Sequence, residues 1–480
     1  MTNGPFIGQP QVAIQPPQSL GVKAARKLAT TTKTVPQMQA ITPRWVLSLL
    51  PWVQVEAGTY RVNRVKVIQR ADERIIASLD GGAARLDPQQ LRAISLFRNL
   101  DEIYLSRIAE RMVCEQAKAG QVVLSEGNLG TKFFIIASGK VEVAAIGDNG
   151  KWERHALLGT GNYFSELSFG TPSNQTATAK ALTDSVFLTL EREQLEDILQ
   201  DSPELHKTLA LALEERTSLS TLVNDHGEKR IAVQLGQHDE ADIPLTYADY
   251  EEEPREYDLS VLQSVVRVNT RVSDLYSAPI DQLREQLRLT IETVKERQEW
   301  ELINNPEFGL LANVASSMRI PTRSGPPTPD DMDELLARVW KKPAFFLAHP
   351  RAIAAFGREC TRRGVPPPTI PLWGCSFITW RGVPLIPCDK LPISGADGVS
   401  AGKTSILLLR VGEKEQGVVG LHHAGVPGEQ LPSLSVRLMG FDGKALASYL
   451  VSLYFSVAVL TDDALGALDN VDLGYYHEYA

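Results

Sequence analysis

Gly120-Gln-Val-Val-Leu-Ser-Glu126-Gly127, continued by Gly130, Phe133-Phe-Ile-Ile136 and Ser138-Gly139, is the stretch that says most about the fold. Short apolar runs alternate there with glycines, and the pattern continues as far as Gly170. Regularly spaced glycines between short apolar strands are typical of a small antiparallel β-roll. The sequence Asp148-Asn149-Gly150 predicts a tight hairpin turn within it.

Two helical patterns bracket this roll, one around Leu100–Met112 and the other over Leu195–Leu222. Just before the roll, Asp87-Pro88 predicts a helix start, because aspartate caps a helix and proline suits its first position. The glycine-rich block and its two helices therefore predict a separate domain over residues 96–225.

Upstream of this block, residues 1–19 are rich in proline and glutamine and resemble an arm rather than a packed domain. Residues 20–28 predict a short basic helix, and the threonines from Thr30 to Thr34 favour extended chain. From Trp52 to Leu79, apolar and polar residues alternate with a period of two. That alternation predicts a long hairpin of half-exposed strands.

Downstream of the block, an acidic stretch ends at Glu256. Apolar residues at helical spacing then predict a long amphipathic helix over Asp281–Asn304. A proline-rich segment leads into a helix from Asp330 to about Trp340. The pattern further predicts a strand over Ile406–Val411 and a buried helix over Lys444–Leu460. Mixed helices and strands place the chain in the α+β class.

The composition of the 480 residues excludes several classes of protein. With 43% hydrophobic and 22% charged residues the chain is globular, and a net charge of −9 opposes general attraction to nucleic-acid phosphates. No signal peptide and no run of about 18 uncharged apolar residues is present, so we expect no membrane partner. The four cysteines form no CxxC pair, which favours a reducing, cytoplasmic location over a disulfide scaffold or a zinc site.

Two segments are similar to motifs of catalytic or metal sites, but the spacing of their residues does not match those motifs. The segment Gly398-Val-Ser-Ala-Gly402-Lys403-Thr404 has three rather than four residues between its glycines and precedes an expected strand, so it is not a phosphate loop. His422 and His423 are adjacent in an expected strand, where their side chains would point to opposite faces and share no metal. We predict one packed and one exposed histidine there, no catalytic residue, no metal site and no enzyme activity.

The glycine-rich block resembles the cyclic nucleotide-binding domain, through the stretch quoted first and through Tyr163-Phe-Ser-Glu-Leu167. The resemblance implies a ligand pocket formed by Ser165, Glu166, Leu167, Gln175 and Thr176. Glu166 stands where the family binds the ribose hydroxyl. Gln175 stands where the family has an arginine that pairs with the cyclic phosphate, and the chain has no lysine or arginine between Arg154 and Lys180.

Losing that arginine has a predictable effect on affinity. A charge-assisted hydrogen bond contributes roughly 1.5–3 kcal/mol, so its loss weakens binding about ten- to a hundredfold or more. We therefore expect no tight binding of cyclic AMP and no certain cofactor. The alternative is a retained fold that serves as a surface or for contacts.

Outside this block, the chain resembles family 2 encapsulin shell proteins over nearly its whole length, and with the insertion it resembles the 2B subgroup. The segments that carry the resemblance are Ile41-Thr-Pro-Arg-Trp45, Val55-Glu-Ala-Gly58, Tyr60-Arg-Val-Asn-Arg64, Arg319-Ile-Pro-Thr-Arg-Ser-Gly-Pro-Pro-Thr-Pro329, Phe345-Phe-Leu-Ala-His-Pro350, Trp380-Arg-Gly-Val-Pro384 and Gly417-Val-Val-Gly-Leu-His422.

The resemblance implies the tailed-phage major capsid fold of the Hong Kong 97 type, carrying the β-roll as an insertion. The expected parts are an N-terminal arm (1–50), the outgoing part of an extended loop (51–95), the inserted cyclic nucleotide-binding-like domain (96–225), the return of the loop (226–256), a peripheral domain with the spine helix (257–345), and an axial domain with the C-terminal part of the body (346–480).

The implied function is structural. Many copies would close into an icosahedral shell around a cargo enzyme, and the 2B subgroup implies a terpene cyclase or a polyprenyl transferase as that cargo, whereas other family 2 shells hold cysteine desulfurase. The inserted domain is expected outside the shell. The alternative is a cyclic nucleotide-responsive regulator without a shell, which would need a basic recognition helix after residue 225, where the chain is instead acidic.

Overall fold

The computed structural model describes most of the chain in two units. The residues described are 19–30, 32–66, 75, 77–80, 83–94, 97–98, 100–146, 152–165, 175, 177–200, 224, 228–233, 246–395, 402–474 and 476. The first unit groups residues 1–60, 257–302 and 420–457, and the second groups residues 61–256, 303–419 and 458–480. Among the described residues, no helix combines the length and the apolar character that crossing a membrane requires.

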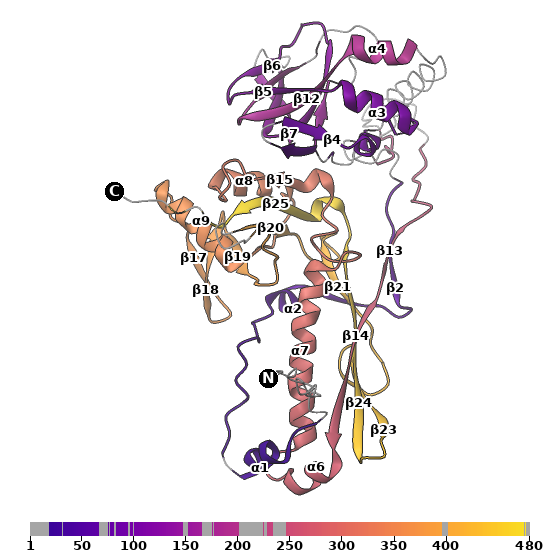
Figure 1. The fold of residues 1–480 in the computed structure, drawn as a ribbon, viewed down its shortest axis with the longest axis vertical. Coiled ribbons are helices and arrows are strands. Elements are labelled where there is room, and N and C mark those ends of the chain that lie inside the picture. The colour runs from indigo at the N-terminus through magenta and orange to yellow at the C-terminus, as the bar shows by residue number, and fades with distance from the viewer. Residues whose placement is uncertain are drawn as a thin grey trace, which may run out of the picture. The chain divides into compact units, whose positions relative to one another are not determined.

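The first unit contains a six-stranded sheet (Figure 1). In the order of pairing, its strands are β1 (Trp52–Gln54), β21 (Val418–His422), β24 (Leu446–Val459), β23 (Leu434–Phe441) and β22 (Glu429–Leu431), and β14 (Ser260–Asn269) also pairs with β24. β14 and β24 run antiparallel over ten residue pairs, from Ser260 opposite Phe455 to Asn269 opposite Leu446. This long pairing makes β24 a central strand.

β24 corrects the buried helix expected over Lys444–Leu460. Ser448, Ser452 and Ser456 recur every four residues, and that spacing fits one face of a helix. Four is also an even number, so the same serines share one face of a strand. The rest of the segment is rich in valine and aromatic residues, which favour strands, and hydrogen bonding to β14 and β23 on both edges selects the strand.

Two helices of the first unit start at side-chain caps. α6 (Thr270–Tyr276) begins where the Asn269 side chain accepts a hydrogen bond from the Val272 amide at 3.3 Å. The 23-residue α7 (Gln282–Asn304) confirms the predicted long helix, although it is only weakly amphipathic. Asp281 accepts a hydrogen bond from the Arg284 amide at 3.0 Å at its start. α1 (Val22–Thr30) confirms the basic N-terminal helix and packs against α6.

The segment around α2 (Trp45–Leu49) is held along α7 by three glutamates of that helix. Arg44 pairs with Glu292 at 2.6 Å and with Glu296 at 3.7 Å. Glu299 accepts a hydrogen bond from the Val46 amide at 3.0 Å and is almost fully buried. The spacing of these glutamates, three or four residues apart, places them on one face of α7, so that face positions the N-terminal segment.

The second unit contains a seven-stranded mixed sheet (Figure 1). In the order of pairing, its strands are β15 (Arg319–Pro321), β25 (Leu465–Asp472), β20 (Lys403–Leu409), β16 (Phe345–Ala348), β19 (Val383–Pro387), β18 (Cys375–Trp380) and β17 (Thr369–Leu372). Short 3₁₀ turns lie at Ser316–Met318 and Asp462–Ala464. β20 confirms the predicted apolar strand, and because β20 begins at Lys403, the segment before it does not open a helix as a phosphate loop must.

α8 (Pro329–Arg338) and α9 (Pro350–Arg362) both pack against β25 and both begin with proline. α8 confirms the helix predicted from Asp330, and Thr328 forms a capping box with Asp331 at its start. His349 caps α9, because its Nδ1 accepts a hydrogen bond from the Arg351 amide at 3.1 Å. Burial lowers the pKa of His349, and the charge of Arg351 lowers it further.

The long hairpin expected between Trp52 and Leu79 is wrong for the part that the structure describes. β1 pairs in parallel with β21, and β2 (Thr59–Val62) pairs with β13 (Arg255–Asp258). Further along, the Lys66 amide donates to the Asp249 carbonyl at 2.8 Å. Alternation with a period of two predicts a strand but not its partner, and here the partners lie about two hundred or more residues away in sequence.

The predicted β-roll is confirmed as two four-stranded sheets. The first is β10 (Tyr163–Phe164), β7 (Lys132–Ser138), β12 (Ser185–Glu191) and β5 (Val113–Ala117), and the second is β6 (Val122–Leu124), β11 (Thr178–Ala181), β8 (Lys140–Ile146) and β9 (Trp152–Gly159). Phe134, Phe164 and Phe187 pack against one another in its core, with Phe134 stacked on Phe164 at 4.9 Å. β8 and β9 form the predicted hairpin, although Asp148-Asn149-Gly150 lies outside the described residues.

Short elements flank the roll. They are β3 (Ala77–Asp80), β4 (Ala83–Leu86), the 3₁₀ helix Pro88–Ala93, α3 (Glu102–Arg111) and α4 (Arg192–Gln200). Asp87 accepts a hydrogen bond from the Gln89 amide, as its predicted role as a cap requires. α3 confirms the helix expected around Leu100–Met112. α4 matches the start of the second predicted helix, whose remainder to Leu222 lies outside the described residues.

Candidate functional site

The predicted ligand pocket of the roll is described only in part. Ser165 and Gln175 lie together, because the Gln175 side-chain amide donates to the Ser165 hydroxyl at 2.8 Å. Glu166, Leu167 and Thr176 lie outside the described residues. The backbone of Gln175 is fixed by hydrogen bonds with Gly127 and Asn128 at 2.9 and 2.8 Å. The side chain at position 175 is therefore a neutral amide that is already hydrogen-bonded to Ser165.

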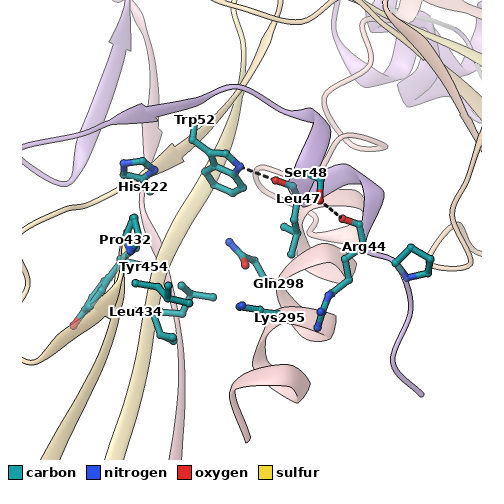
Figure 2. A pocket seen from close by; sticks show the side chains of 14 residues that line it. Arg44, Leu47, Ser48, Trp52, Lys295, Gln298, His422, Pro432, Leu434 and Tyr454 are labelled. Atoms are coloured by element: carbon teal, nitrogen blue, oxygen red, sulfur yellow. Dashed lines mark hydrogen bonds between the residues drawn. The ribbon is translucent and has the colours of Figure 1, made fainter. Parts of the chain in front are cut away.

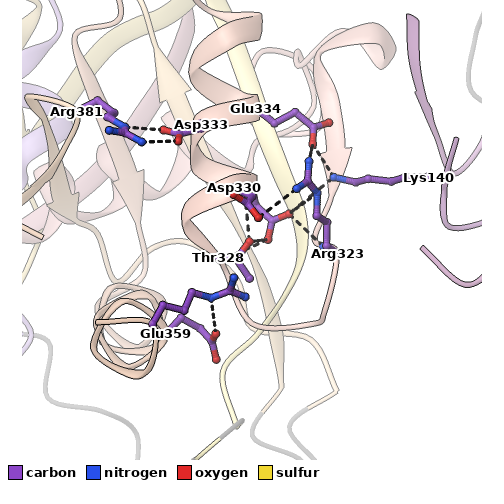
Figure 3. A network of polar contacts seen from close by, with 10 residues as sticks. Lys140, Arg323, Thr328, Asp330, Asp333, Glu334, Glu359 and Arg381 are labelled. Carbon is purple, nitrogen blue, oxygen red and sulfur yellow. Dashed lines mark hydrogen bonds and ion pairs between the residues drawn. The ribbon is translucent and has the colours of Figure 1, made fainter. Parts of the chain in front are cut away.

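A cluster of buried charges connects the roll to α8 (Figure 3). Lys140, at the start of β8, is only 2% exposed, and its Nζ lies 2.9 Å from Glu334 Oε2 and 3.8 Å from Asp331 Oδ1. Arg323 reaches the same carboxylates, 3.3 Å from Glu334 and 3.9 Å from Asp331. Arg323 also lies 3.4 Å from Asp330 Oδ2, so two cations face three carboxylates. Lys140, Asp331 and Glu334 are largely closed to water, whereas Arg323 and Asp330 are partly exposed.

The carboxylate side of this cluster is held in place by α8. The Thr328 hydroxyl donates to Asp331 Oδ2 at 2.7 Å, and the Arg323 amide donates to Oδ1 at 3.2 Å. Burial raises the pKa of Asp331, whereas the Thr328 hydrogen bond and the charge of Lys140 oppose that rise. Lys140 is fixed through its backbone, since its amide donates to Thr183 Oγ1 at 3.0 Å. Both sides of the cluster are therefore preorganised.

A cavity of about 470 Å³ lies in the first unit (Figure 2). Its lining comes from the segment around α2, from α7, and from the sheet strands and their connections: Pro43, Arg44, Leu47, Ser48, Trp52, Lys295, Gln298, His422, Leu431, Pro432, Ser433, Leu434, Leu453 and Tyr454. The Trp52 indole N–H donates to the Leu47 carbonyl at 3.0 Å and stacks on His422 with 6.1 Å between ring centroids. This indole forms one wall of the cavity.

The two adjacent histidines differ from the prediction of one packed and one exposed ring, because both are half-buried. His422 faces the cavity, and burial lowers its pKa, so the ring is neutral near pH 7. His423 Nδ1 lies 2.7 Å from the Val55 carbonyl. This close contact with the Val55 backbone explains why the His423 ring is half-buried.

The chain is similar to known proteins over almost its whole length. The family model described as "Type 2A encapsulin shell protein SrpI-like" matches residues 216–475, which is more than half of the chain. The type 2A encapsulin shell protein SrpI of Synechococcus elongatus is 66% identical over 250 residues, which cover 52% of this chain and 80% of that protein. The chain belongs to the encapsulin shell protein family.

Two further matches extend over almost the full length of the encapsulin. A type 2A encapsulin shell protein of Mycolicibacterium paratuberculosis is 38% identical, with 96% of this chain and 97% of that protein covered. The cryo-EM structure of the holo-SrpI encapsulin complex of Synechococcus elongatus has a TM-score of 0.54 and 41% identity, and covers 96% of this chain and 99% of that one. The mixed α/β body described above is thus an encapsulin shell fold.

The roll of this encapsulin matches a second family model. A model of the cyclic nucleotide-binding domain matches residues 114–202. The combination predicted from the sequence, a shell protein with an inserted cyclic nucleotide-binding domain, is therefore confirmed.

Neither the cavity nor the charged cluster of the encapsulin was predicted from the sequence. Lys295 and Gln298 are one helical turn apart on α7, which places them on the same face, but nothing in the sequence shows that a sheet faces them. Lys140 and Glu334 are 194 residues apart, and no local pattern pairs them. The predicted helix start near Asp330 was the one signal that pointed to this region.

Proposed function

We propose that many copies of this encapsulin assemble into a closed, hollow, icosahedral shell that sequesters a cargo enzyme. The observation that carries the proposal is the match over 96% of the chain to a subunit of a holo-encapsulin complex. Contacts that close under rotation give finite particles rather than fibres, which is the geometry that a container requires. In this proposal the residues of the chain form walls and contacts, and the chemistry belongs to the cargo.

An exposed apolar strand supports assembly. On β23 the side chains of Leu438, Met439 and Phe441 are 52, 61 and 66% exposed. Large exposed apolar residues that lie this close together mark surfaces that contact another protein. We assign β23 to a contact between neighbouring copies. The N-terminal arm, residues 1–50, is assigned to clasping an adjacent subunit.

The proposed roles of the remaining parts follow the expected division of the chain. Residues 51–95 and 226–256 form the outgoing and returning parts of an extended loop, and they flank the insertion at 96–225. The peripheral domain spans 257–345, and the axial domain spans 346–480. We place the insertion outside the shell, because a domain of about 130 residues needs space that a closed wall does not offer.

The inserted domain is proposed to sense a ligand from that outer position. Its ligand contacts are Ser165, Glu166, Leu167, Gln175 and Thr176. Since Gln175 replaces the phosphate-binding arginine, the ligand is not bound with the affinity typical of cyclic AMP sensors. An epitope tag inserted at residues 148–150, where the sequence predicts a turn, tests the position. Antibody binding to intact shells supports an outer location, and binding only to disrupted shells contradicts it.

The proposed cargo is an enzyme of terpene or isoprenoid metabolism, such as a terpene cyclase or a polyprenyl transferase. This rests on the resemblance to the 2B subgroup. The four cysteines, Cys114, Cys360, Cys375 and Cys388, are all free, which supports a reducing cytoplasm as the location. Coexpression of such an enzyme with and without its disordered targeting segment tests the cargo. Copurification with shells only when the segment is present supports it.

Assembly is tested by size-exclusion chromatography with light scattering and by negative-stain electron microscopy of the full chain. We expect uniform hollow particles of megadalton mass. Met439→Asp with Phe441→Asp and, separately, deletion of residues 1–34 should reduce assembly. Ile103→Asp is the matched control, because Ile103 is 72% exposed on the inserted domain. Monomers or dimers at every salt concentration and pH would refute the shell and favour the regulator.

A further inference from the structure

The cavity of the first unit has the size and lining of a small-molecule site. Ligand cavities in proteins typically measure about 300–1,000 Å³ and are lined by apolar groups with a few placed polar ones. The volume here is about 470 Å³. Leu47, Trp52, Leu434 and Leu453 supply apolar walls from three separate parts of the unit. Figure 2 shows the Lys295 and Gln298 side chains projecting from α7 into the space that these walls enclose.

Gln298 is the first sign that something belongs in the cavity. Its side chain lines the cavity and is only 7% exposed, yet it has no hydrogen-bond partner among the residues that the structure describes. The polar atoms of its amide are not sealed within the protein and remain accessible from the cavity, so their capacity for hydrogen bonds is open there. The Gln298 amide therefore offers a donor and an acceptor to a molecule in the cavity.

The charge in the cavity comes from Lys295. It precedes Gln298 by one helical turn, and no ion pair joins it to any residue within the described ranges. Arg44, the other cation of the lining, is already paired with Glu292 and Glu296. His422 adds no charge near pH 7, because burial lowers its pKa. Within the described residues, an ammonium without an ion pair thus stands beside an amide without a hydrogen bond, against apolar walls.

We propose that this cavity binds a small amphipathic anion. The carboxylate of the ligand accepts hydrogen bonds from the Lys295 ammonium and the Gln298 amide, and its hydrocarbon part packs against Trp52 and the leucines. A cation would be repelled by Lys295, and a purely polar molecule would leave the apolar walls uncovered. The proposal does not rest on shell assembly, since all the lining residues belong to one unit of one chain.

Calorimetric titration of the full chain with decanoate tests the head group. Decanol, which has the same tail without the charge, is the matched ligand. We expect decanoate to bind about ten- to a hundredfold more tightly than decanol, because a charge-assisted hydrogen bond is lost with the carboxylate. Lys295→Met and Gln298→Leu should each weaken decanoate binding and leave decanol binding unchanged. Arg284→Met, on an exposed turn of the same helix, should change neither.

Fluorescence quenching tests the location. Bromodecanoate should quench Trp52, so the difference in quenching between the unaltered chain and Trp52→Phe reports binding at this wall. Equal affinity for decanoate and decanol, or quenching that Trp52→Phe does not reduce, would overturn the proposal. So would decanoate binding that appears only when residues 1–18 are deleted, since the cavity would then be the site of the chain's own N-terminal segment.

Discussion

Replacing Lys140 by methionine should destabilise the contact between the roll and α8. Methionine keeps the apolar stem of the side chain and removes its charge, which leaves Glu334 and Asp331 short of one of their two cations. Lys140 and Asp331 are 2% and 0% exposed, so water cannot replace the lost partner. Breaking a buried ion pair by removing one side costs about 3–5 kcal/mol.

Hydrogen–deuterium exchange followed by mass spectrometry measures this loss locally in the full chain. The reporters are the Leu182 amide, which donates to the Lys140 carbonyl, and the Met332 amide at the start of α8. At about 1.4 kcal/mol per factor of ten, exchange in both segments should be roughly a hundred- to a few thousandfold faster in Lys140→Met. Adding Glu334→Gln should recover part of the loss, because it removes the stranded carboxylate.

Lys132→Met is the matched control on the same roll. Lys132 pairs with Glu115 at 2.7 Å, but both side chains are more than 30% exposed, and such pairs contribute only about 0–1 kcal/mol. The loss in Lys140→Met should also shrink at lower pH, since the pKa of Asp331, already raised by burial, rises further without Lys140 and the carboxyl takes up a proton. Exchange no faster in Lys140→Met than in Lys132→Met would refute the reasoning.

Three further outcomes follow from individual contacts. Because the pKa of His349 is lowered in the folded chain, the unfolded chain binds a proton first as the pH falls below about 6.5, and the free energy of unfolding should drop there. The drop should be smaller in His349→Asn, where asparagine still caps α9. An equal pH dependence in the two proteins would contradict this. Burial raises the pKa of Cys360 to about 11, so a thiol reagent at pH 8 should modify exposed Cys375 first, and Cys375→Ser should remove the fast phase. Gly420→Ala places a methyl group 2.7 Å from the Trp52 ring, which should lower the free energy of unfolding by roughly 1–3 kcal/mol. An unchanged midpoint in denaturant unfolding would show that the Trp52 ring can move aside without cost.

Elements set by neighbouring residues were predictable. The capping signals near Asp87 and Asp330, and the glycine pattern of the roll, lead directly to the observed helices and strands. Each depends on contacts within a few positions of the chain. The helix predicted over Lys444–Leu460 was wrong because an almost uncharged apolar segment fits both a buried helix and a buried strand. Only the pairing of β24 with β14 and β23 decided between them.

By itself, the sequence determined the local elements, the family resemblance and the inserted domain. The tertiary structure alone decided which strands pair, that Lys140 enters the carboxylate pair of α8, and that Lys295 and Gln298 face a cavity beneath Trp52. The physical reason is the distance along the chain over which each kind of interaction acts. Caps, turns and periodicity act over about four residues, whereas a buried ion pair or a cavity exists only when segments far apart in the chain are packed together.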